Sequence, residues 1–289
     1  MIECVNDRRI MSCNFYYFGI FKPNAMIQTN THYIPLWQFE LLKQEKEILH
    51  YVTSRFGGVS EGIYSTFNQS YTAGDFKEHV IENRRRLARE LEITTGMLLF
   101  PGQTHTAHVK VIRSYEELKD RITETDGLVT DLPEICVSVL TADCVPLLLY
   151  DPQKKVVAAV HAGWRGTVQS ITLEAVDVMK EQFGCNPANI LAGIGPSIGP
   201  ENYEVGQNVV RAVYENPYIH NESVIKEKSN RKALFNLWES NRQQLLIGGL
   251  KNENIEQAGI CTLESHKTFF SARKLGNPCG RSAAGLMLQ

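Results

Sequence analysis

The sequence lacks any long run of apolar residues. No such run approaches the roughly 20 residues that a membrane-spanning helix needs, so we expect no membrane partner. The chain also lacks an excess of positive charge, because its 289 residues carry a formal net charge of −2 at pH 7. Binding to nucleic acid or to an anionic membrane is favoured by a basic surface. We therefore expect no nucleic-acid partner either.

Paired cysteines are absent as well. The seven cysteines are an odd number, are scattered along the chain and form no CxxC pair. This pattern argues against a disulfide framework and favours a reducing compartment, so we predict a cytoplasmic protein. Apolar residues make up 43% of the chain and charged residues 21%, as in ordinary soluble globular proteins.

Two apolar runs in the middle of the chain organise the rest. Residues 145–150 and 156–160 are short, leucine-rich or β-branched, and are separated by the turn signal DPQKK at 151–155. Such runs are typical of adjacent buried strands. If the turn folds them into a hairpin, Cys144 before the first run and His161 after the second become neighbours.

A buried cysteine is more often a small apolar side chain than a ligand, and a single histidine is usually structural. The context here favours chemistry, because Asp143 precedes the cysteine and the sequence AGWRG follows the histidine. An acid, a tryptophan and an arginine at one strand end pack poorly but suit a site. Strand alternation points Asp143 away from the Cys144 face, so we expect it to support the site.

The remaining pattern predicts one α/β domain with mixed β-sheets packed between helices. Many strands are linked by hairpins, which excludes a doubly wound parallel sheet. We expect the domain to span residues 26–289, and a helix to run from Thr167 to about Phe183 with Gly184 as its terminator. Residues 1–25 have no core pattern and no signal-peptide cleavage motif. We interpret them as an upstream extension without function.

Several motifs, in this order along the chain, resemble those of the YfiH-type family, also called laccase-domain or multicopper polyphenol oxidoreductase proteins. The most specific are TADC at 141–144 and HAGWRG at 161–166. The other matches are RFGGVS at 55–60, GD at 74–75, ENRR at 82–85, QTH at 103–105, GP at 195–196, YEVG at 203–206, FSAR at 270–273 and GR at 280–281.

The resemblance implies a layered α/β/β/α sandwich. It also implies phosphorolysis of adenosine, inosine, guanosine and methylthioadenosine, and hydrolytic deamination of adenosine. The substrates would then be purine nucleosides and phosphate. A catalytic metal needs a third ligand beside Cys144 and His161, and the residues alone leave His105 and His108 as candidates in one loop. The family pattern matches His105, which gives the ligand set His105, Cys144 and His161.

Two imidazoles and one thiolate suit zinc, with a fourth position open for water or substrate. Copper also accepts these ligands. For phosphate we assign Arg55, in a glycine-rich loop, and Arg165, at a helix start, because guanidinium groups and helix N-termini bind anions. Arg165 could instead brace the turn. Asn68 is a further candidate for a substrate contact.

The laccase name implies a mononuclear copper and a trinuclear cluster. Eight scattered histidines without an HxH pair do not furnish both, so we predict no laccase activity. Two other functions remain open. Cys144 and His161 could act as the nucleophile and base of a cysteine hydrolase, or the chain could be a metal-binding protein without catalysis.

Overall fold

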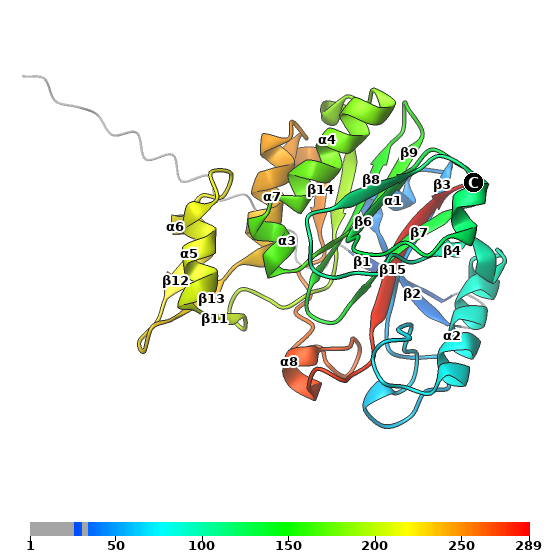
Figure 1. Cartoon of the computed structure of the whole chain (residues 1–289), viewed down its shortest axis with the longest axis horizontal. Helices are drawn as coiled ribbons and strands as arrows, with labels where there is room; N and C mark the ends of the chain where they lie inside the picture. The colour runs from blue at the N-terminus through cyan, green and yellow to red at the C-terminus, as the bar shows by residue number, and fades with distance from the viewer. Residues whose placement is uncertain (1–25, 31–33) are drawn as a thin grey trace, which may run out of the picture.

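Two six-stranded mixed β-sheets lie face to face between layers of helices (Figure 1). The structure is a computed structural model that describes residues 26–30 and 34–289. The first sheet has the strand order β1 (Met26–Asn30), β2 (Pro35–Phe39), β3 (Ile48–Thr53), β15 (Ser282–Leu288), β7 (Cys136–Thr141) and β4 (Leu98–Leu99). The second has the order β14 (Ile255–Gln257), β10 (Leu191–Ile194), β8 (Val145–Asp151), β9 (Val156–Ala162), β6 (Gly127–Thr130) and β5 (Val109–Ile112).

The alternation of side chains along β8 shows why the sheets stack. Leu147 and Leu149 belong to the apolar cluster under the helices, whereas Leu148 and Tyr150 belong to the cluster between the two sheets. Successive side chains of a strand point to opposite faces, so a continuous apolar run serves two cores at once. This is why the sequence of β8 shows no polar alternation.

Helices cover the outer face of each sheet (Figure 1). Helices α4 (Ile171–Phe183) and α7 (Leu237–Ile247) pack on the second sheet. Helix α2 (Lys77–Glu90) packs on the first sheet through Leu87. The layers are therefore helix, sheet, sheet and helix, which confirms the predicted α/β/β/α sandwich.

A smaller sheet extends the molecule at the yellow end of Figure 1. It consists of β11 (Glu204–Gly206), β13 (Lys232–Phe235) and β12 (Ile225–Glu227), with α5 (Gln207–Glu215) and α6 (Asn221–Val224) beside it. The remaining short helices are α1 (Glu40–Lys43), α3 (Trp164–Val168) and α8 (Ala272–Leu275).

The predicted helix 167–183 is wrong in its first turn. The chain forms α3 from Trp164 to Val168 and then breaks, because Ser170 adopts a left-handed backbone with φ 65°. The amide of Asn216 donates to Val168 O at 3.0 Å and to Ser170 Oγ at 2.8 Å. Asn216, which is 46 residues from Ser170 in sequence, thus stabilises the interruption between α3 and α4. Helical spacing within 167–183 does not reveal this distant contact.

Of the helices that the structure describes, none combines the length and apolar character required to span a bilayer. The five cysteines within the described residues are all free. The predicted N-terminal extension, residues 1–25, lies outside the described residues.

Candidate metal centre and substrate cavity

The β8–β9 hairpin brings Cys144 and His161 together. The two strands pair antiparallel, with Val145 opposite Ala162 and Pro146 opposite His161. Cys144 immediately precedes β8, so its side chain lies beside the end of β9. The hairpin inferred from the turn signal at 151–155 is thereby confirmed.

His105 completes a group of three possible metal ligands. One nitrogen from each histidine and the Cys144 sulfur all lie within 4.8 Å of one another. The Cys144 Sγ and His105 Nε2 atoms are 3.9 Å apart, and the two imidazole rings meet edge to face with centroids 5.0 Å apart. His161 is buried and His105 is exposed, so the group is open on one side. These three residues could hold a metal ion.

Asp126, directly before β6, supports both histidines. Its buried carboxylate accepts a hydrogen bond from His161 Nδ1 at 2.8 Å and from the His105 backbone N–H at 3.1 Å. It also accepts from the N–H groups of Thr104 and Thr106 and from the Thr106 hydroxyl. His105 has a left-handed backbone with φ 64°, which is uncommon outside glycine. The convergence of these donors on one carboxylate holds that conformation.

The hydrogen bonds also set the charges of the group. Burial disfavours ionised Asp126, but the bonds from His161 and Thr106 outweigh it and lower the pKa of this carboxyl to about 2. Burial disfavours the charged forms of Cys144 and His161 too. Their mutual attraction outweighs it, so the pKa of Cys144 is lowered and that of His161 is raised. The site therefore favours a thiolate at Cys144.

The first glycine of the HAGWRG motif, Gly163, is required for steric reasons. A Cβ built on Gly163 would lie 2.9 Å from His105 Cδ2 and 3.0 Å from Cys144 Sγ. Real Cβ atoms essentially never lie closer than 3.0 Å to another heavy atom, so a side chain here would force the His105 ring to shift and would crowd the Cys144 sulfur. Only glycine lets the start of α3 approach them so closely.

Asp143 ties the surrounding loops together, but strand alternation does not explain its orientation, because it lies in the bend between β7 and β8 and lines the same cavity as Cys144. Its backbone is left-handed with φ 87°, and its carbonyl accepts from the N–H of Ile198 at 2.9 Å. Its carboxylate accepts from Thr262 Oγ1 and from the backbone N–H of Arg273, each at 2.7 Å. Three distant segments are tied together next to the cysteine.

A cavity of about 920 Å³ opens beside the three possible ligands. Small-molecule sites commonly enclose roughly 300–1,000 Å³. His105, Cys144, His161 and Tyr203 are among the residues that line it. Four arginines also line it: Arg84, Arg121, Arg273 and Arg281. The wall thus combines a ligand group with several cations.

The three residues predicted to contact phosphate or substrate are not among those that line this cavity. The Arg55 guanidinium donates to the carbonyls of Ser65 and His266, each at 2.7 Å, and lies 5.0 Å from the Phe270 ring. It braces loops. Arg165 is the second residue of α3 and is exposed, with its guanidinium 4.6 Å from the ring of Trp164.

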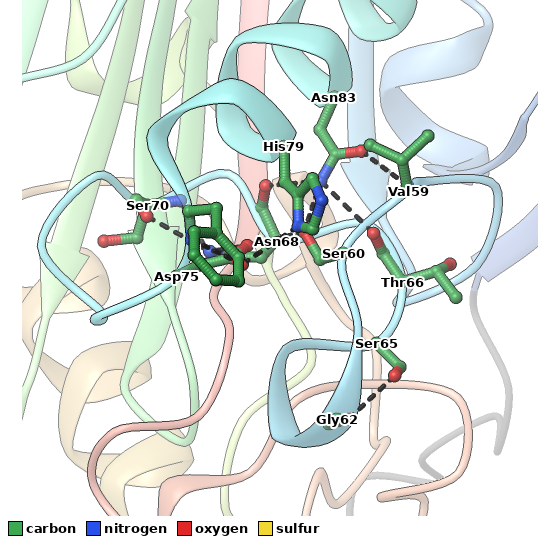
Figure 2. A network of polar contacts seen from close by, with 11 residues as sticks. Val59, Ser60, Gly62, Ser65, Thr66, Asn68, Ser70, Asp75, His79 and Asn83 are labelled. Carbon is green, nitrogen blue, oxygen red and sulfur yellow. Dashed lines mark hydrogen bonds and ion pairs between the residues drawn. The ribbon is translucent and has the colours of Figure 1, made fainter.

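Asn68 belongs to a buried polar network in the loop before α2 (Figure 2). Its amide donates to Ser70 O and Asp75 Oδ2, and its oxygen accepts from the N–H groups of Ser70 and Arg281. Asn83 joins the same network through Ser60 Oγ and Asn68 O. Asn68 therefore uses its hydrogen-bonding capacity within the protein and has none left for a substrate.

Asp126, Tyr203 and Arg273 were not predicted as site residues. The one signal for Asp126 was an acid directly before the short apolar segment 127–130. Tyr203 and Arg273 stand in the motifs YEVG and FSAR, but local spacing gives no sign that both residues line one cavity.

A comparison with family models matches residues 49–289 to the family described as multi-copper polyphenol oxidoreductase laccase. Among curated proteins, the chain is 37% identical over 256 residues to a purine nucleoside phosphorylase of Bacteroides thetaiotaomicron, covering 86% of this chain and 95% of that protein. It is 35% identical over 259 residues to adenosine deaminase RL5 of an unknown prokaryotic organism, covering 88% of this chain and 98% of that protein.

Solved structures agree with the observed fold. The structure of YlmD from Geobacillus stearothermophilus matches with a TM-score of 0.85 and 29% sequence identity, covering 92% of this chain and 100% of the other. That of the hypothetical protein YfiH from Bacillus licheniformis matches with a TM-score of 0.83 and 30% identity, covering 88% of this chain and 96% of the other. The layered sandwich described above is shared with both.

Proposed function

The chain belongs to the multi-copper polyphenol oxidoreductase laccase family, and from this premise we propose that it is a zinc-dependent enzyme of purine nucleosides. It would cleave adenosine, inosine, guanosine and methylthioadenosine with phosphate, and would deaminate adenosine with water. The observation that carries the proposal is the His105, Cys144 and His161 group at the wall of the cavity. Relatives named purine nucleoside phosphorylase and adenosine deaminase support the substrate class.

The donor set fits zinc. Asp126 accepts from His161 Nδ1, which leaves Nε2 of that ring available to a metal. The favoured thiolate of Cys144 is the form that coordinates, and two nitrogens with one sulfur leave a fourth position open, as in catalytic zinc sites. Copper accepts the same donors. When bound, zinc lowers the pKa of a coordinated water to about 7 and thus supplies hydroxide at neutral pH.

The residues of the chain have separate tasks in this proposal. Asp126 fixes the tautomer and orientation of His161, and positions the His105 backbone through a second hydrogen bond. Gly163 keeps space beside both ligands. The cavity walls hold the nucleoside and, for phosphorolysis, a phosphate, whose charge the lining guanidinium groups can balance.

The possible metal ligands in the described residues do not support a multicopper oxidase mechanism. Within the described residues, one group of histidine, cysteine and acidic side chains has the spacing of a metal site. A mononuclear copper site plus a trinuclear cluster needs several such groups. We therefore assign no laccase reaction to the cavity.

A cysteine hydrolase is the second candidate, because Cys144 has a lowered pKa and a neighbouring imidazole, as an activated nucleophile requires. A metal-binding protein without catalysis is the third. Zinc content separates the first two, since a thiolate committed to zinc is not free to attack. Substrate turnover distinguishes a non-catalytic metal-binding protein from both enzymes.

The test is metal analysis of purified protein combined with activity assays. We expect about one zinc per chain, adenosine deamination without phosphate, and inosine cleavage only with phosphate present. Removal of zinc by a chelator should abolish deamination, and added zinc should restore it. Metal-free protein with full activity would contradict the proposal and favour the cysteine hydrolase.

A further inference from the structure

Phosphorolysis requires a phosphate next to the nucleoside, and the two arginines that the sequence assigns to it, Arg55 and Arg165, do not line the cavity. Four arginines do: Arg84, Arg121, Arg273 and Arg281. They differ in how many N–H donors remain free for a ligand.

Two of these arginines are largely occupied within the protein. Arg281 donates from both terminal nitrogens to backbone carbonyls of the loop before β15, including Asn277 O at 2.9 Å. Arg84 donates from two nitrogens to Gln69 O, and its guanidinium lies between the rings of Tyr71 at 4.4 Å and Phe100 at 4.2 Å. Both hold the cavity wall in shape.

Arg273 is fixed at its backbone and free at its side chain. Its N–H donates to Asp143, the neighbour of Cys144, at 2.7 Å. Its guanidinium lies 5.2 Å from the Tyr203 ring and makes one hydrogen bond, to Glu204 O at 3.1 Å. In the part of the chain that the structure describes, no carboxylate forms an ion pair with this guanidinium. Most of its five donors therefore remain available.

Tyr203 lies against Arg273 and lines the same cavity as the metal-ligand group. Burial raises the pKa of Tyr203, the charge of Cys144 raises it further, and the charge of Arg273 opposes the shift. Tyr203, Cys144 and Arg273 all line one cavity. Arg165 also opposes the shift at Tyr203, but unlike Arg273 it does not line the cavity.

We propose that Arg273, stacked on Tyr203, binds the inorganic phosphate used in phosphorolysis. This inference rests on the proposed function. A phosphate oxygen forms a bond to the ribose C1′ atom while the bond from C1′ to the purine nitrogen breaks. The electron pair goes to the purine, and the proton of hydrogen phosphate ends on the released base. Arg273 holds the phosphate in its guanidinium fork and balances its charge.

The decisive variants are Arg273→Ala and Arg273→Lys, assayed as zinc-loaded full-length protein. Loss of a charge-assisted contact should raise the phosphate KM of Arg273→Ala by about tenfold or more. The nucleoside KM should change much less, and adenosine deamination, which uses no phosphate, should fall by a smaller factor. Lysine keeps the charge without the fork, so Arg273→Lys should recover part of the phosphate affinity.

Three control variants sharpen the assignment. Lys274→Ala removes the neighbouring exposed cation on α8 and should leave the phosphate KM unchanged. Arg165→Ala and Arg121→Ala test the other exposed arginines near the cavity. A phosphate defect in either of these, with a normal phosphate KM in Arg273→Ala, overturns the proposal. Equal loss of both reactions in Arg273→Ala with normal zinc also overturns it, because the residue then only braces the wall.

Equilibrium binding of radiolabelled inorganic phosphate separates this inference from the proposed function. If wild-type protein binds phosphate and Arg273→Ala binds it at least about tenfold more weakly, Arg273 is the phosphate residue even if no nucleoside is cleaved. If wild-type protein binds no phosphate, or Arg273→Ala binds it equally well, the inference fails whatever the activity.

Discussion

Asp126 is the residue on which the geometry of the candidate centre depends. One oxygen of its carboxylate accepts from His161 Nδ1 and the other from Thr106 Oγ1, with three backbone N–H groups shared between the two oxygens. Partners of this kind orient metal ligands and fix their tautomers, and their loss typically lowers metal affinity 10–100-fold.

We predict that Asp126→Asn weakens zinc binding by about 10–100-fold. The asparagine NH₂ group would face the N–H groups that now donate to the Asp126 carboxylate. A buried donor without an acceptor costs free energy. Competition with a chelator of known affinity measures the effect. Asp131→Asn, at an exposed position after β6, is the matched control. Equal zinc affinity in both variants would contradict the role given to Asp126.

Cys144 tests whether sulfur serves as ligand or nucleophile. If it is a ligand, Cys144→Ala should lose zinc and adenosine deamination together, because one of three protein donors is gone. We expect activity to fall at least about 100-fold, beyond the range for an outer partner. Metal analysis and deamination are measured on the same preparation. A variant that keeps one zinc per chain but is inactive would favour the nucleophile.

At the scale of elements, β3 carries a buried histidine that is hydrogen-bonded to the end of β2, at the junction where α1 begins. His50 is 1% exposed, and its Nε2 accepts from the backbone N–H of Phe39 at 2.9 Å. Burial lowers the pKa of His50 to about 4, although the hydrogen bond from Phe39 acts in the other direction. Accepting this hydrogen bond requires an unprotonated Nε2 atom, so the folded state favours the neutral form of His50.

This junction predicts a pH dependence of stability. The folded-state pKa is lower than the value of about 6.5 in an unfolded chain, so the unfolded state binds more protons between pH 6.5 and 4. The contribution of neutral His50 is therefore present above pH 6.5 and is lost as the pH falls toward 4. Roughly 3 kcal/mol of unfolding free energy should disappear over this window at about 1.4 kcal/mol per unit.

The comparison is denaturant unfolding of wild type and His50→Gln at several pH values. Glutamine retains an acceptor but does not titrate, so the variant should show a flatter dependence between pH 4 and 6.5. Parallel curves for the two proteins would show that His50 does not titrate in this range.

At the scale of the whole molecule, the described sheet begins with β1. Met26 is buried and pairs with Phe39 at the edge of the first sheet. The predicted domain 26–289 therefore starts at a residue with a packing role. The segment before it carries no core pattern in the sequence.

We predict that a chain starting at Met26 folds and is as active as the full chain. Removal of residues 1–30 should lower thermal stability and activity, because it also deletes β1 and exposes the edge of β2. Thermal unfolding and nucleoside cleavage of both truncations test this. A loss of solubility or activity on removing residues 1–25 alone would show that this segment has a function.

Local pattern was enough to predict the hairpin and an α/β domain with mixed sheets, whereas the layered sandwich was implied by the resemblance to a known family. Cys144 and His161 meet because they flank two apolar runs, 145–150 and 156–160, that are joined by a short turn. Antiparallel pairing across that turn places the start of β8 beside the end of β9. The positions of Leu147 and Leu148 on opposite faces follow from the two-residue period of a strand. These features depend on neighbours in sequence, which the sequence displays directly.

The tertiary structure alone decided which side chains surround the three possible ligands. Asp126 reaches His161 across 35 residues, and Asp143 reaches the N–H of Arg273 across 130. It also decided that Arg55 and Asn68 brace loops, since their partners lie up to 211 and 213 residues away. The chemical type of a residue predicts what it can bind. Which partner it meets depends on how distant segments pack, and no local spacing encodes that distance.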